Sequence, residues 1–199
     1  MRILLVFCHP ARESFQGTIL DELAGRLGRE GHAVRIVDLY GDRFDPVLDL
    51  DGWRAHIENR RLDNGLTGYL DALGEAEGLI LVYPTWWYGL PAMLKGWIDR
   101  VWQPGLAFTI EGGAFRTRTL GRIRRFAVIT TCGSPRWFIE RIVGDPARRQ
   151  LMRGLALQFA RGCKRRWRAI YGVDGRPRAD LARERERAID SVARLFAGP

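Results

Sequence analysis

The sequence has little cysteine, and its apolar runs are short. Three cysteines, at positions 8, 132 and 163, give neither a disulfide framework nor a metal-ligand spacing with another Cys or His. No apolar run approaches the roughly 18 residues that a membrane helix needs. The apolar N-terminal segment ends after six residues, which is typical of a buried strand rather than a signal peptide. We therefore expect a cytoplasmic protein without a metal and without membrane insertion.

Lysine is also scarce, since 30 of the 32 basic residues are arginine, and the net charge is +9. An arginine bias of this size is typical of a genome-wide codon preference. Basic clusters at 122–125 and 161–168 also fit an anionic partner such as a nucleotide cofactor or a nucleic acid. The aromatic and glycine signatures of nucleic-acid modules are absent, so we predict no nucleic-acid partner.

The length of 199 residues and the apolar content of 46% suit one domain, residues 1–199, with a substantial core. Apolar runs predict five strands. Apolar residues at helical spacing predict helices between them. The strands are expected at 3–8, 33–38, 79–83, 125–131 and 167–171. The helices are expected after Ser14, over 66–73, over 91–102, around 151–159 and over 188–196. Two polar or Gly-rich excursions, 40–64 with one short helix and 103–122, interrupt this pattern.

This alternation predicts an α/β three-layer sandwich with a parallel sheet between two helical layers. The first strand is not followed by GxGxxG, which argues against a dinucleotide-type sheet. We therefore predict a five-stranded sheet in the flavodoxin-like order 2-1-3-4-5. Ligands of such sheets bind beyond the carboxyl ends of the strands. That rule selects the loops after the first, third and fourth strands.

The first of these loops, Cys8 to Gln16, leads into a helix N-terminus, where free N–H groups favour an anion. His9, Arg12 and Ser14 add donors, so the loop is a candidate phosphate cradle. The plainer interpretation is that Ser14 only caps the helix.

The second loop holds three consecutive aromatic residues, Trp86, Trp87 and Tyr88, directly after a buried strand. All three cannot point into one core, and a side chain on the ligand side would stack on a flat aromatic ligand. The alternative is aromatic core filler. The third loop, Thr130 to Pro135, is short and rich in hydroxyl and N–H groups, so it suits a polar ring edge, or is an ordinary strand-to-helix turn.

These segments resemble the NAD(P)H:quinone oxidoreductase family of flavodoxin-like flavoproteins. The resemblance is carried by His9 with Ser14–Phe15, by 83–101, by 105–108 and by 130–134, in the same order along the chain. The stretch 83–101, YPTWWYGLPAMLKGWIDRV, is highly specific to that family. The resemblance implies a bound flavin, FMN or FAD, NAD(P)H as co-substrate and a quinone or similar small acceptor.

The resemblance also implies a role for individual residues. The flavin phosphate region would contact His9, Ser14, Phe15 and Gln16. The isoalloxazine would lie beside Pro84, Thr85, Trp86, Trp87 and Tyr88. Its pyrimidine edge would meet Thr130, Thr131 and Gly133. Phe108, from the partner subunit of a homodimer, and Trp137 would line the substrate pocket.

The sequence departs from the family pattern in two places. Cys132 replaces the first glycine of a usual Thr-Gly-Gly. The Tyr and His that relay charge in studied quinone reductases fall at Trp137 or Phe138 and at Val143, so no catalytic residue is assigned. We also expect a homodimer. One helix carries four bulky residues, Leu94, Trp97, Ile98 and Val101, and one face of the sheet need not cover all of them.

Three other functions compete with the oxidoreductase. Some relatives of the family are ancillary, regulatory subunits of potassium efflux systems, and bind flavin without needing turnover. An electron-carrier flavodoxin is disfavoured, because those proteins are typically acidic and this chain carries +9. A nucleic-acid module would show strongly salt-dependent binding.

Overall fold

A computed structural model describes residues 1–111, 114–116 and 119–198, and its strands and helices alternate along the chain. The strands are β1 (Arg2–Phe7), β2 (Ala33–Asp38), β3 (Gly78–Pro84), β4 (Thr109–Glu111), β5 (Ala114–Arg116), β6 (Arg125–Cys132) and β7 (Lys164–Tyr171). The α-helices are α1 (Phe15–Arg29), α2 (Leu50–Ile57), α3 (Thr67–Glu75), α4 (Ala92–Val101), α5 (Pro146–Arg149) and α6 (Arg178–Phe196).

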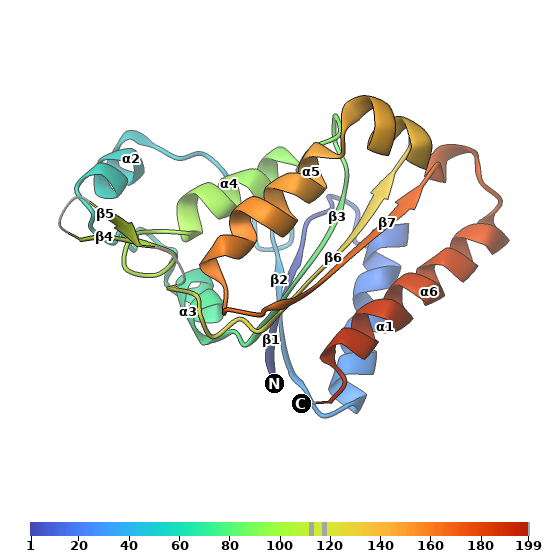
Figure 1. Ribbon diagram of the computed structural model, residues 1–199, viewed down its shortest axis with the longest axis horizontal. Helices are drawn as coiled ribbons and strands as arrows, with labels where there is room; N and C mark the ends of the chain where they lie inside the picture. Colours follow the sequence, from blue (N-terminus) through green and yellow to red (C-terminus); the bar gives the residue numbers. More distant parts are fainter. Residues whose placement is uncertain (112–113, 117–118, 199) are drawn as a thin grey trace.

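Five of the strands form one parallel sheet in the order β2-β1-β3-β6-β7, which confirms the predicted order 2-1-3-4-5. Helices cover both faces, with α1 and α6 on one side and α3 and α4 on the other (Figure 1). Side chains alternate along each strand, so β1 and β3 supply apolar residues to both layers. Leu4, Val6, Leu79 and Leu81 lie in one buried cluster, and Ile3, Leu5, Ile80 and Val82 lie in the other.

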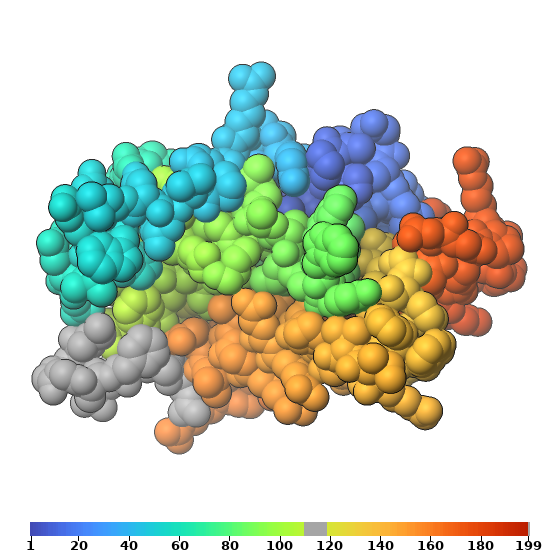
Figure 2. All heavy atoms as spheres, turned by 90° about the horizontal axis from the view of Figure 1, so that it is seen from above, coloured from blue at the N-terminus to red at the C-terminus, as the bar shows by residue number. Residues whose placement is uncertain are grey.

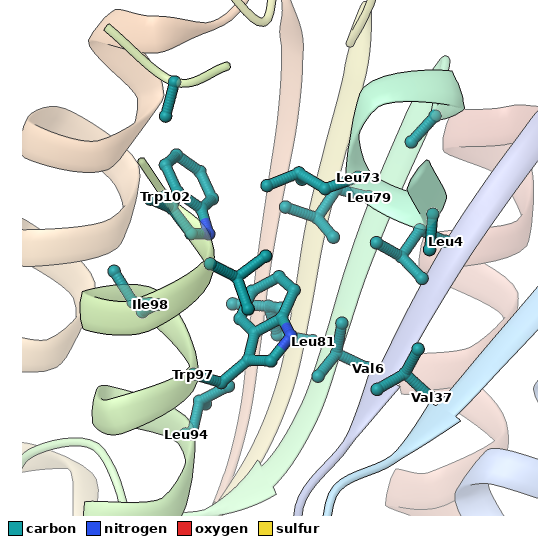
Figure 3. Packing of buried hydrophobic residues seen from close by; sticks show 14 of the residues in the cluster. Leu4, Val6, Val37, Leu73, Leu79, Leu81, Leu94, Trp97, Ile98 and Trp102 are labelled. Carbon is teal, nitrogen blue, oxygen red and sulfur yellow. The ribbon is translucent and has the colours of Figure 1, made fainter. Parts of the chain in front are cut away.

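The four bulky residues of α4 are all buried inside the chain itself. Leu94, Trp97 and Val101 have no exposed surface, and Ile98 is 8% exposed. Figure 3 shows the Trp97 ring of α4 directed at Leu81 of the sheet. Their crowding on one helix was the sequence argument for a homodimer, and that argument is wrong because the sheet and its neighbouring elements cover them all.

The helix expected around 151–159 is present as consecutive π-helical and 3-10 turns instead of one α-helix. A π-helical turn spans Phe138–Val143, α5 has four residues, a second π-helical turn spans Gln150–Gly154 and a 3-10 turn spans Leu155–Gln158. Gly144 and Asp145 both adopt left-handed backbone conformations, at φ 82° and 50°, and Pro146 follows. These residues separate the first π-helical turn from the helical turns that run without a gap from Pro146 to Gln158.

The other differences between the predicted and observed elements lie in segments where no apolar pattern marks the structure in the sequence. Strand β7 begins at Lys164, three residues before the expected start, and the added residues are exposed and basic. The excursion 40–64 holds the one short helix expected, α2, whereas the excursion 103–122 holds an unexpected β4–β5 hairpin. Within the described residues, none of the helices has both the length and the apolar character to cross a membrane.

Candidate functional site

The three loops singled out by the sequence meet at one edge of the sheet. They follow β1, β3 and β6, which are neighbours in the order of strands, and parallel strands end at the same edge. Figure 2 looks onto this edge and shows the green segment after β3 between the blue start of α1 and the yellow-orange segment after β6. The fold therefore brings together residues that are more than 100 positions apart.

The first loop ends in a capped helix N-terminus. Ser14 has an extended backbone, and its hydroxyl accepts a hydrogen bond from the Gly17 amide at 3.2 Å. The first-turn N–H groups and the positive end of the helix dipole thus face the carboxyl edge of the sheet. His9 Nδ1 lies 2.9 Å from the Ala11 carbonyl and 3.0 Å from its amide, which leaves Nε2 for a ligand. Capping and anion binding are compatible at such a terminus.

Arg12 is not a free donor in this loop. Its guanidinium pairs with Asp21, and this hydrogen bond raises the pKa of Arg12 and lowers the pKa of Asp21. The Arg12 backbone approaches the helix so closely that a Cβ on Gly17 would lie 1.7 Å from the Arg12 carbonyl oxygen. Glycine at this position therefore lets the loop fold back over the first turn of α1.

Gln16 joins all three loops. Its side chain is buried, and its amide nitrogen donates to the Tyr83 carbonyl at 2.8 Å and to Thr131 Oγ1 at 3.1 Å. Its carbonyl oxygen Oε1 is buried without a hydrogen-bond partner. A buried amide oxygen without a partner is costly unless a ligand supplies a donor. The predicted contact of Gln16 with the phosphate region stays a prediction, and its amide nitrogen is already engaged within the protein.

The second loop is a tight turn that presents two tryptophans to solvent. Trp86 and Gly89 exchange backbone hydrogen bonds at 3.2 and 2.8 Å, and the two residues between them, Trp87 and Tyr88, have φ of 47° and 64°. A two-residue turn of this kind normally holds Asn or Gly, because bulky side chains are disfavoured at positive φ. Trp86 is 58% exposed and Trp87 is 91% exposed, so neither is core filler.

The third loop presents hydroxyl groups that are hydrogen-bonded to the second. The Thr85 amide donates to the Thr131 carbonyl at 2.8 Å, and the hydroxyls of Thr85 and Thr130 lie 3.0 Å apart. A Cβ on Gly133 would lie 2.2 Å from the Asp174 carboxylate, so a larger residue there would require the Asp174 side chain to move. Burial raises the pKa of the Cys132 thiol, which keeps it protonated and unreactive near neutral pH.

The two residues expected in the substrate pocket lie in different places. Trp137 follows the third loop, is 60% exposed, and its ring centroid is 5.8 Å from that of Phe138. Tyr88 of the second loop lies 5.9 Å from the same Phe138 ring, so aromatic side chains connect the two loops. Phe108 instead lies 6.0 Å from His56 of α2, at the far end of the molecule from the three loops (Figure 1). One chain does not bring Phe108 to its own site.

Asp145 is a buried residue near the site that the sequence did not reveal. It is 8% exposed, has a left-handed backbone, and its Oδ2 has no hydrogen-bond partner. Burial raises the pKa of Asp145, and its charge contributes to raising the pKa of Tyr83 and Tyr171, whose rings come from β3 and β7. The only sequence signal was the turn-forming triplet Gly144-Asp145-Pro146. In the described part of the chain, no cluster of His, Cys, Asp and Glu could hold a metal.

A family model described as flavodoxin-like fold matches residues 1–192. Among curated proteins, an uncharacterized NAD(P)H oxidoreductase of Escherichia coli is 38% identical over 110 residues, which cover 54% of this chain and 55% of that protein. Human ribosyldihydronicotinamide dehydrogenase [quinone] is 28% identical over 163 residues, which cover 74% of this chain and 70% of that protein. Matches to the first three curated relatives span only 55%, 63% and 55% of their lengths.

Solved structures share the fold along the whole chain. An NAD(P)H:quinone oxidoreductase from Methanothermobacter marburgensis superposes with a TM-score of 0.81 at 24% identity, covering 100% of this chain and 98% of that one. An FMN-dependent NADH-azoreductase from Bacillus anthracis, solved in complex with FMN, has a TM-score of 0.72 at 15% identity, with 98% of both chains covered. At these identities the likeness concerns the fold.

Proposed function

Because this chain belongs to the flavodoxin-like fold family, we propose that it is a flavin-dependent NAD(P)H oxidoreductase. Its electrons would pass from NAD(P)H through a bound flavin, FMN or FAD, to a quinone or similar small acceptor. Curated relatives named as NAD(P)H oxidoreductases and quinone dehydrogenases support this activity. The neighbour solved with FMN supports the choice of cofactor class.

The convergence of three different surfaces at one sheet edge carries the proposal. A helix N-terminus suits a phosphate, an exposed aromatic turn suits a flat ring, and buried threonine hydroxyls suit a polar ring edge. The unpartnered Oε1 of Gln16 lies between these loops, and a ligand N–H or hydroxyl would satisfy it.

Each of the three loops would bind a different part of the flavin. Ser14, Phe15 and His9 would hold the phosphate end at the start of α1. Pro84 to Tyr88 would lie along the ring system, and Thr130, Thr131 and Gly133 would meet its pyrimidine edge. When bound, the flavin supplies the two-electron hydride chemistry. The protein orients it, covers it from water and tunes it by hydrogen bonds.

A homodimer would complete the site. The surface around α2 carries exposed apolar side chains, namely Val47, Leu50, Trp53 and Ile57, which are 62%, 58%, 52% and 67% exposed. Apolar groups gathered in this way mark an interaction surface. Phe108 packs beside the same helix, so a partner subunit docked there would receive Phe108 near its own three loops.

Anaerobic stopped flow tests the proposed activity directly. The flavin-loaded protein is mixed with NADPH or NADH, and absorbance near ~450 nm is followed before and after a benzoquinone is added. We expect bleaching by a reduced nicotinamide and recovery by the quinone over many turnovers. Bound flavin that neither coenzyme bleaches would contradict the proposal and leave the chain a flavin-binding regulatory subunit.

A further inference from the structure

A groove rich in arginine lies outside the three loops. It has a volume of about 870 Å³ and runs between the edge strand β7 and α6, from Arg166 to Tyr171 along the strand. Its charged lining comprises seven arginines, Arg136, Arg148, Arg166, Arg168, Arg176, Arg187 and Arg194, and three acids, Glu140, Glu184 and Asp190. This volume lies in the range of small-molecule sites, and its charge favours an anion.

The acids neutralise only part of this lining. Arg136 pairs with Glu140 at 2.9 Å, Arg187 with Glu184 at 3.2 Å, and Arg194 with Asp190 at 3.6 Å. Within the ranges that the structure describes, Arg148, Arg166 and Arg168 form no ion pair. Arg166 and Arg168 are two positions apart on β7 and therefore project from the same face of the strand.

Like charges crowd each other at this point of the groove. Burial lowers the pKa of the Arg168 guanidinium, the neighbouring charge of Arg166 lowers it further, and the charge of Glu184 offsets part of this decrease. A charged edge alone protects a strand from pairing with another chain. That protection requires neither a concave groove nor unpaired arginines directed into it. A phosphate bound between the two guanidinium groups would relieve the repulsion through paired N–H donors.

The groove opens next to the candidate flavin site. Its upper end includes Tyr171 and Arg136, and the Gly172 amide, which follows β7, donates to the Ser134 carbonyl of the third loop at 3.1 Å. Trp137, beside Arg136, belongs to the aromatic contacts that reach Tyr88 of the second loop. A ligand with a ring at the flavin and phosphates farther along would therefore follow a continuous surface.

We infer that this groove binds the phosphates of the adenosine end of NADPH, with Arg166 and Arg168 at its 2′-phosphate, so that the protein prefers NADPH to NADH. This inference rests on the proposed oxidoreductase function. It adds a binding site on β7 to the three loops and selects one coenzyme of the two.

The test compares Arg166→Gln/Arg168→Gln with a control that loses the same charge elsewhere. Arg2→Gln/Arg29→Gln is that control, since Arg2 begins β1, Arg29 ends α1, and neither lines the groove. Steady-state rates with NADPH and NADH are measured at 0.15 M salt, with flavin absorbance as the check on folding. We expect KM for NADPH to rise about tenfold in the groove variant, with kcat and KM for NADH unchanged, and no change in the control.

A binding measurement keeps the inference testable if turnover fails. Calorimetric titration with 2′,5′-ADP and with 5′-ADP should show tighter binding of 2′,5′-ADP to the unmodified protein, and this preference should be lost in the groove variant. Equal affinity for the two nucleotides, or equal losses in groove and control variants, would overturn the inference. So would tighter binding of a single-stranded oligonucleotide than of NADPH through the same two arginines. Protein that oxidises neither coenzyme yet keeps the 2′,5′-ADP preference would refute the proposed function and support the groove.

Discussion

The two halves of the candidate site are built in opposite ways. The polar half, around Gln16, Thr130 and Thr131, is buried and held by hydrogen bonds that join α1 to β3 and β6. The aromatic half, at Trp86 and Trp87, is exposed and sits on a backbone that bulky residues rarely adopt. The first half contributes to folding whether or not a ligand is present. The second half costs free energy in the free protein, and a ligand or partner would offset that cost.

The largest effect is expected where the first loop folds over α1. Gly17→Ala places a methyl group against the Arg12 carbonyl oxygen, so the loop or the helix must move. We expect a loss of about 3 kcal/mol in the free energy of unfolding, measured by urea denaturation, together with loss of flavin binding. Gly28→Ala in the same helix is the matched control, because a Cβ there meets nothing within 4 Å. It should stabilise the protein by about 0.5–1 kcal/mol. Equal effects of the two changes would contradict the close approach.

The next largest loss of stability is expected when the hydrogen bonds of Gln16 to the other two loops are removed. Gln16→Met keeps the volume but leaves the Tyr83 carbonyl without its donor. The expected loss is about 1–3 kcal/mol of unfolding free energy, with weaker flavin binding. Gln150→Met, at an exposed position, serves as the control. A Gln16 variant with unchanged stability and flavin affinity would show that the polar half is not preformed.

The aromatic half should respond in the opposite direction. Trp87→Asn places a residue that tolerates positive φ at the strained turn, and it removes a stacking face. We expect the flavin-free protein to gain about 1 kcal/mol in stability. The flavin dissociation constant should rise by an amount worth roughly 0.5–1.5 kcal/mol. Leu157→Asn, at an exposed apolar residue of the 3-10 turn Leu155–Gln158, should leave flavin affinity unchanged. A stabilised variant with unaltered affinity would remove Trp87 from the site.

The sequence predicted the framework of the site better than its internal contacts. Buried strands, the Ser14 cap and the aromatic run after β3 were visible because each leaves a local pattern. The hydrogen bonds of Gln16 were not visible, because their partners, Tyr83 and Thr131, lie 67 and 115 positions away in the sequence. Two other features do not follow from residue spacing alone. The burial of Trp97 depends on packing, and the turn at Gly144 and Asp145 depends on backbone conformation.

The smallest effect is expected from pH. By the resemblance to the quinone reductases, the positions of their Tyr and His relay are expected at Trp137 or Phe138 and at Val143, and none of these residues carries a titrating proton. Burial raises the pKa of Tyr83 and Tyr171 from values already above neutrality, so both stay protonated between about pH 6 and 8. The rate of flavin reduction at saturating NAD(P)H should therefore vary little across that range. A tenfold inflection that disappears in a histidine variant, or in Asp145→Asn, would reveal a relay.

Identification of the bound chromophore tests the central claim most directly. Protein purified from cells is heated, and the released supernatant is separated by chromatography against FMN and FAD standards. We predict a yellow protein with absorption near ~450 nm that releases one of these two flavins, and a colourless preparation should regain the colour with one of them. Protein that stays colourless after reconstitution with both FMN and FAD would contradict the assignment of these three loops to a flavin.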